Sequence, residues 1–96
     1  MGILAFLRRK KKTETAEERR SRLLTHGRIT DGIIIDIEAN DDGEAVAQYS
    51  YSVHGAEFES SDILTNEQVA DGLRYAPGAS VAIRFDQNNH GNSVIV

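Results

Sequence analysis

The feature that most constrains this chain is the spacing of its apolar residues, which becomes alternating after Gly27. Five short segments beyond that glycine place apolar side chains on one face and polar side chains on the other. Short strands of this kind hide their apolar faces by curling into a barrel. The sequence therefore predicts a mainly β fold, a small five-stranded, partly open barrel (SH3-like or OB-like) with a short N-terminal helix and one short inserted helix.

Turn signals separate the predicted strands. Residues 40–43 read Asn-Asp-Asp-Gly, and Asp-Gly supplies the positive φ angles that tight hairpins need. His54 and Gly55 turn the second strand into a third strand around Phe58. The Pro-Gly pair at 77–78 fits the centre of a type II turn before the fourth strand. A terminal strand is expected at 93–96.

The strand pattern also predicts which side chains face the core. In the first strand, Ile33, Ile35 and Ile37 are expected to share the inner face, while Ile34 interrupts the alternation and suggests a strand buried on both sides. The second strand alternates more strictly. Its predicted inward residues are Ala45, Ala47, Tyr49, Tyr51 and Val53. The two tyrosines are therefore assigned to the core rather than to a surface that stacks bases.

Two capping boxes mark the helices. Thr15 with Glu18 begins the first, and Thr65 with Gln68 begins the second. Glu18 and Arg22 are spaced for an ion pair on the first helix. The predicted organisation is a basic flexible tail at 1–14, a lead-in helix at 15–26 and a small β-barrel domain at 27–96.

Charge is divided unevenly along the chain. Residues 1–26 have a net charge of +5, and residues 27–96 have a net charge of −9 with no lysine. Because nucleic-acid affinity comes largely from neutralised phosphates, the acidic barrel is not expected to bind nucleic acid. The chain has no cysteine, which excludes disulfides and cysteine-based zinc sites and suits a cytoplasmic location.

Motifs for catalysis or cofactor binding are not found in the sequence. No serine lies in a G-x-S-x-G elbow, and no Gly-Lys-Ser/Thr phosphate loop is present. His26, His54 and His90 each precede a glycine, which is typical of turns, and their spacing matches no metal motif. The sequence therefore predicts a protein that is not an enzyme, with no catalytic, cofactor-binding or metal-ligating residues and no cofactor.

The N-terminus is the candidate contact site. Ile3, Leu4 and Leu7 share one face if this segment is helical, and five cations follow at once. These cations are Arg8, Arg9, Lys10, Lys11 and Lys12. The apolar part is too short to span a bilayer but is suited to weak contact with an anionic membrane or a partner. The alternatives are a solvated tail and a tail that lies against the acidic barrel of its own chain.

Three segments resemble a known bacterial family, the domain of unknown function numbered 3592. They are the glycine-spaced entry into the first strand at 27–33, the aromatic–glycine–aromatic hairpin at 49–58, and the strand ending in aromatic-Asp at 78–86. The chain departs from the family at Gln87 and His90, where members often have proline. The resemblance implies a small β-barrel, and it brings no known catalytic residues.

These observations favour a non-catalytic protein-interaction or scaffold module. Its barrel edges, expected around Phe58 and Val94, or its acidic face would meet a protein partner or a second copy. A first alternative is a peripheral adaptor at the inner face of a membrane, acting through residues 3–12. A second alternative is a barrel that binds a small ligand or nucleic acid.

The membrane alternative makes a direct prediction. At low salt the full chain should sediment with anionic vesicles and not with neutral ones, because each cation near such a surface contributes about 1 kcal/mol. A chain lacking residues 2–12 should stay in the supernatant in both cases. Equal sedimentation of the two chains would contradict the assignment of membrane contact to this segment.

Overall fold

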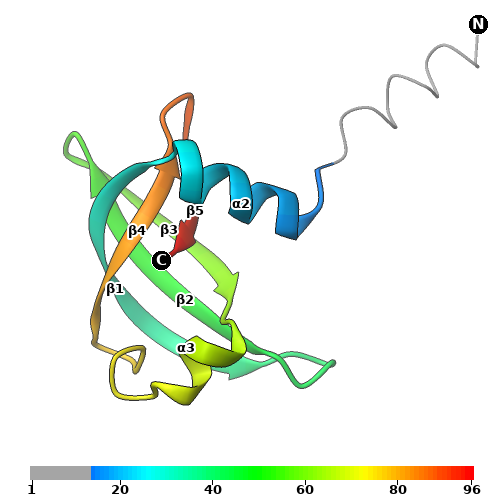
Figure 1. Ribbon diagram of the computed structural model, residues 1–96. Helices are drawn as coiled ribbons and strands as arrows, with labels where there is room; N and C mark the ends of the chain where they lie inside the picture. The colour runs from blue at the N-terminus through cyan, green and yellow to red at the C-terminus, as the bar shows by residue number, and fades with distance from the viewer. Residues whose placement is uncertain (1–13) are drawn as a thin grey trace, which may run out of the picture.

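The computed structural model describes residues 14–96, which form one sheet and two helices (Figure 1). In chain order the elements are α2 (Ala16–His26), β1 (Arg28–Ala39), β2 (Ala45–Val53), β3 (Ala56–Ile63), α3 (Asn66–Ala70), β4 (Ser80–Asp86) and β5 (Asn89–Ile95). The strand order in the sheet is β3-β2-β1-β4-β5, and every neighbouring pair is antiparallel.

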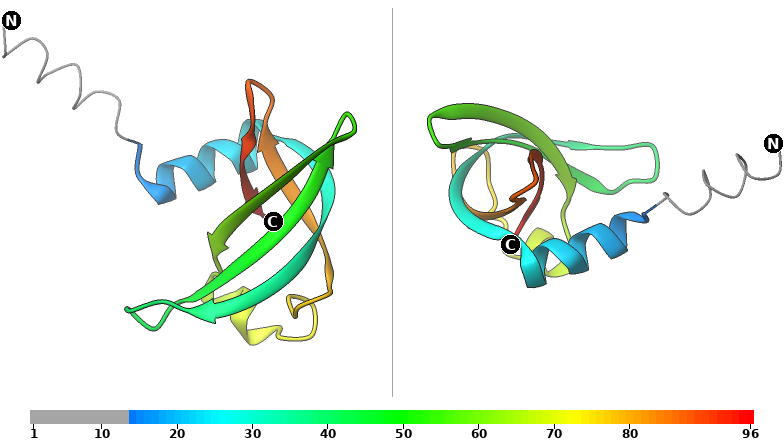
Figure 2. Two further views of the ribbon diagram at one scale, coloured as in Figure 1. Left: turned by 180° about the vertical axis from the view of Figure 1, so that it is seen from behind. Right: turned by 90° about the horizontal axis from the view of Figure 1, so that it is seen from above.

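The sheet curls until its two terminal strands approach each other, which makes a nearly closed barrel (Figure 2). The long strand β1 pairs with β2 along one side and with β4 along the other. The short helix α3 lies in the connection between β3 and β4. The predicted fold class is therefore confirmed, and this order of elements corresponds to its OB-like form.

Local sequence accounts for the turns and helix starts. Gly43, Gly55 and Gly78 all have positive φ, at the three turns that the sequence predicts. Ala79 donates its backbone N–H to Ala76 O at 2.9 Å, which closes the predicted type II turn. Both capping boxes form, with Thr15 and Thr65 as the N-cap residues. The last strand starts earlier than expected, because a tight turn after β4 lets pairing resume at Asn89.

An aromatic row fills the barrel interior. Tyr49 and Tyr51 are 0% and 3% exposed, and their ring centroids lie 5.9 Å apart. Tyr51 also stacks on Phe58 and Phe85 at centroid distances of 5.6 and 6.5 Å. The Tyr49 hydroxyl lies 2.6 Å from Ser93 Oγ, so that β2 is joined to β5 through the core. The tyrosines are thus core residues, as predicted.

The predicted inward orientation of Ile33 and Ile35 is wrong, whereas that of Ile37 is confirmed. Ile34 is fully buried, whereas Ile33 and Ile35 remain 52% and 49% exposed. Pairing with β2 passes from Ile34 directly to Asp36, so that Ile35 is the extra residue of a β-bulge. The bulge restores the inward position to Ile37 and turns Asp36 outward. Ile34, which interrupts the alternation in the sequence, is therefore the fully buried isoleucine of β1.

Helix α2 packs on the outer face of β4 and β5. Leu23 is its one buried residue, and Leu23 and Val94 are both buried outside the inner core. Arg22 holds the helix to the sheet through an ion pair with Asp86 at 3.1 Å. The expected Glu18–Arg22 pair is replaced by pairs of Arg22 with Asp86 and Glu14. Glu18 instead accepts a hydrogen bond from the Thr15 backbone N–H.

The packing of α2 predicts a difference between two adjacent leucines. Leu23→Ala should lower the free energy of unfolding by about 2–4 kcal/mol, because it empties a fully buried site. Leu24→Ala should cost less than about 1 kcal/mol, because Leu24 is 36% exposed. Urea unfolding followed by circular dichroism measures both values, and equal losses would contradict the proposed docking of α2.

Candidate functional site

The first candidate site lies where β3 and β5, the two terminal strands of the sheet, approach each other. Asp62 of β3 accepts a hydrogen bond from the Ile95 N–H of β5 at 3.0 Å. The Ile95 carbonyl accepts from Arg20 at 2.9 Å and from Gln68 at 3.3 Å. These contacts satisfy both backbone groups of Ile95, and an unsatisfied buried group would cost about 1–3 kcal/mol. We call Asp62, Arg20, Gln68 and Ile95 the seam network.

Asp62 is the charged centre of this network. Its Oδ2 lies 3.5 Å from Arg20 Nη1, and the residue is 9% exposed. Burial raises the pKa of the Asp62 carboxyl, while the hydrogen bond from Ile95 and the charge of Arg20 oppose the increase. Because Arg20 comes from α2, the ion pair joins the helix to both terminal strands. The contacts of this network have a structural effect, because they satisfy the backbone of Ile95 and join α2 to the sheet.

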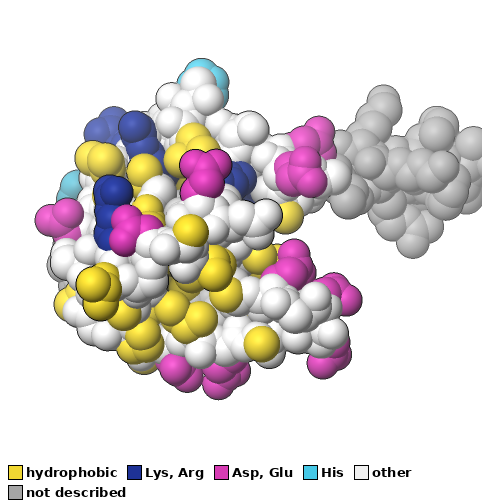
Figure 3. Space-filling view, turned by 60° about the horizontal axis from the view of Figure 1, so that its bottom comes forward, with side chains coloured by type: hydrophobic (Ala, Val, Ile, Leu, Met, Phe, Trp, Pro, Cys, Tyr) yellow, Lys and Arg dark blue, Asp and Glu magenta, His cyan; other side chains and the backbone are white. Residues whose placement is uncertain are grey.

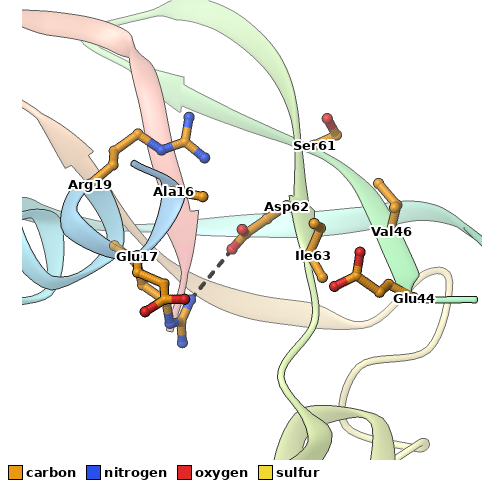
Figure 4. A pocket seen from close by; sticks show the side chains of 9 residues that line it. Ala16, Glu17, Arg19, Glu44, Val46, Ser61, Asp62 and Ile63 are labelled. Atoms are coloured by element: carbon orange, nitrogen blue, oxygen red, sulfur yellow. Dashed lines mark hydrogen bonds and ion pairs between the residues drawn. The ribbon is translucent and has the colours of Figure 1, made fainter. Parts of the chain in front are cut away.

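A groove opens beside the seam network, between the start of α2 and the β2 and β3 strands (Figure 4). Its volume is about 320 Å³. We call it the seam groove, and it is lined by Ala16, Glu17, Arg19, Arg20, Glu44, Val46, Ser61, Asp62 and Ile63. Ile63 is 43% exposed in this groove, and Val46 is half-buried.

A second candidate site is the outer surface of β1. Ile29, Ile33 and Ile35 point outward and are 62%, 52% and 49% exposed, and we call these three residues the isoleucine face. Ile33 pairs with Ser50 of β2 and Ser80 of β4, whose short side chains leave it prominent. A shallow hollow of about 330 Å³ lies beside Ile33 and over these serines. Exposed aliphatic side chains in one row are typical of contact surfaces.

Hydrophobic side chains also gather over the middle of the face shown in Figure 3, with acidic side chains at its margins. Val69 in α3 is 51% exposed, and Leu73 after α3 is 93% exposed. The isoleucine face differs from these residues because its three side chains are held in a row by the sheet. The alternating pattern of β1 did not predict this face, although the interrupted alternation at Ile34 is a signal of the bulge that creates it.

Two of the three histidines lie together. The rings of His54 and His90 are 6.0 Å apart between centroids, and His90 packs edge-on against Phe85 at 5.4 Å. His54 has a φ of 51° within its turn, and His26 ends α2. Within residues 14–96, no three metal-ligating side chains come together. The hairpin acids Asp41 and Asp42 lie within a turn in which the side chain of Asn40 accepts hydrogen bonds from the backbone N–H groups of Asp42 and Glu44.

The predicted contact residues at the N-terminus lie outside the described part of the chain. They are Ile3, Leu4, Leu7, Arg8, Arg9, Lys10, Lys11 and Lys12. Their contact with a membrane or partner therefore stays a prediction. Among residues 14–96, neither helix is long and apolar enough to cross a membrane.

Comparison with known proteins gives one match. The family model described as domain of unknown function (DUF3592) matches residues 25–96, which include all five strands. No curated protein and no solved structure matches the chain.

The seam network predicts opposite pH effects for two aspartates. The pKa of Asp62 is raised in the folded protein, so its contribution to stability falls as pH rises from the unfolded value of about 4. The pKa of Asp86 is lowered, chiefly by the hydrogen bond from the Asn88 backbone N–H. Its contribution to stability is therefore present above about pH 4 and is lost as the pH falls.

The stability loss caused by Asp62→Asn should therefore shrink as pH rises from about 4 to about 7, whereas that of Asp86→Asn should shrink as pH falls below about 4. Urea unfolding of both variants and the parent protein across this range measures the two trends. Trends of the same sign would contradict the assignment of Asp62 as the desolvated carboxylate of the seam.

Proposed function

Since the chain belongs to the DUF3592 family, whose description names no activity, we propose from its geometry that it is a non-catalytic interaction module that binds a second copy of itself through the isoleucine face. The single observation that carries this proposal is the row of Ile29, Ile33 and Ile35 on one strand, which are 62%, 52% and 49% exposed. Burial of aliphatic surface contributes about 25 cal/mol per Å², so three such side chains favour association.

The shape of the isoleucine face favours a second copy as the partner. A two-fold contact needs a surface that is complementary to itself. Ile33 projects beside a hollow over Ser50 and Ser80, so an antiparallel contact between two β1 strands lets each Ile33 enter the hollow of the other copy.

The affinity should be modest. Asp31 is exposed on the same face between Ile29 and Ile33, and it limits the apolar area that two copies can bury. Small interfaces with a charged residue at the centre bind weakly, so a dissociation constant on the order of 10 µM is expected. Such an affinity suits a scaffold module that assembles when its local concentration is high.

Charge argues against nucleic acid as the partner. OB-like barrels bind nucleic acid on the β2–β3 surface and on the β1–β2 and β4–β5 loops. Here the β1–β2 loop region carries Asp41, Asp42 and Glu44, and β3 carries Glu57 and Glu59. These carboxylates repel phosphates, and Tyr49 and Tyr51 are buried in the core. A protein partner is therefore favoured over nucleic acid.

Sedimentation velocity over two decades of protein concentration tests the proposal. The full chain should shift from monomer to dimer as its concentration rises. Ile33→Asp should raise the dissociation constant of the dimer at least tenfold, which corresponds to about 1.4 kcal/mol of binding free energy. Leu73→Asp is the matched control, because it places the same charge on a side chain that is 93% exposed outside the sheet.

The control should dimerise like the parent chain. Ile33→Thr keeps a β-branched side chain on the strand, so its dissociation constant should lie between those of the parent chain and Ile33→Asp. Two results would show that the isoleucine face does not mediate self-association. One is a parent chain that stays monomeric at every concentration, and the other is an equal rise of the dissociation constant in Ile33→Asp and Leu73→Asp. Thermal unfolding of each variant establishes that the comparison is made between folded proteins.

A further inference from the structure

The seam groove combines an apolar floor with an acidic margin. Val46 and Ile63 form the apolar part, and Ala16 of α2 faces them (Figure 4). Glu17 and Glu44 are both exposed and add carboxylates on opposite walls. Arg19 lies at the other end of the groove from Glu44, where its guanidinium approaches Asn92 at 3.5 Å. Arg20 is already paired with Asp62.

Further acidic residues extend this margin. Asp41 and Asp42 are exposed in the hairpin that leads into Glu44, and Glu14 is exposed where the described chain starts. Figure 3 shows acidic side chains gathered along the side of the molecule where the described chain starts. Residues 14–96 carry six arginines, no lysine and fifteen acidic residues, a net charge of −9. An occupant of this groove must therefore be apolar in part and basic in part.

We propose that the occupant is the N-terminal segment of the same chain, residues 3–12. The segment has Ile3, Leu4 and Leu7 for the apolar floor and five consecutive cations for the acidic margin. Residues 1–13 carry five basic and no acidic side chains, which gives a net charge of +5 opposite the −9 of the rest. This docking surface is separate from the isoleucine face and does not rest on the proposed self-association.

Chain length and connection favour this occupant over a separate molecule. Only residues 13–15 separate the segment from α2, and Ala16 and Glu17 at the start of α2 line the groove. From Leu7 to Ala16 the chain can span about 30 Å when extended, which is enough to return to the groove. Covalent connection gives an effective concentration in the millimolar range, so even a weak contact is populated.

Paramagnetic relaxation in the full chain tests the proposal. The native chain has no cysteine, so Ala5→Cys provides one attachment point for a nitroxide label. Docking should cause loss of the amide signals of Glu44, Val46 and Ile63, which lie far from position 5 in the sequence. Raising the salt concentration should restore these signals in part, because it screens the contacts between cations and carboxylates.

A pair of charge reversals provides the matched comparison. Glu17→Lys with Glu44→Lys should restore the signals by removing the acidic margin of the groove. Glu59→Lys with Glu67→Lys changes the net charge equally on exposed residues outside the groove, and it should leave the signal loss intact. Restoration by both pairs would mean a general charge effect and would overturn the specific docking.

Three other outcomes would also overturn the proposal. Unchanged signals at Glu44, Val46 and Ile63, or equal broadening over the whole surface, would show that the segment does not occupy the groove. A mixture of spin-labelled chain with isotope-labelled, spin-free chain separates contacts within a chain from those between chains. Signal loss of the same size in the mixture would assign the groove to the segment of a second copy.

Discussion

The barrel depends on how the backbone of Ile95 is satisfied where the sheet ends meet. Terminal strands leave N–H and C=O groups without ladder partners, and burying such groups is costly. Here one carboxylate, Asp62, accepts the Ile95 N–H, while Arg20 and Gln68 donate to its carbonyl. The three side chains come from β3, α2 and α3, so closing the seam fixes the place of both helices. The edges expected around Phe58 and Val94 are indeed the terminal strands β3 and β5, but they face each other instead of lying open to a partner.

The surface features follow from two further constraints. The bulge at Ile35 keeps Asp36 out of the core and at the same time leaves Ile33 and Ile35 facing outward, so core packing and the isoleucine face have one cause. The separation of charge has a different effect, because an acidic domain attached to a basic, partly apolar segment attracts that segment. The proposed dimer contact and the proposed docking of residues 3–12 therefore use different surfaces and different forces.

Much of the fold was predictable because its determinants are local. The capping boxes at Thr15 and Thr65, the turn glycines and the alternation of β2 each depend on residues within a few positions of one another. The β1 prediction failed because a bulge depends on the pairing with β2, which the sequence of β1 alone does not reveal. The Glu18–Arg22 prediction failed because Asp86, distant in sequence, offered Arg22 a partner across the packed helix.

The sequence by itself determined that the chain folds as a small β-barrel, where its turns and helices begin, and that a basic segment precedes an acidic domain. Its match to a family of unknown function is also a property of the sequence. Only the tertiary structure decided which isoleucines are exposed, that Asp62 pairs with Arg20 and Ile95, and that a groove lies beside them. The physical reason is that Asp62 contacts residues 33 and 42 positions away in the chain, while the groove and the exposed isoleucines depend on how the strands pair and pack. Neither kind of contact leaves a periodic signal in the sequence.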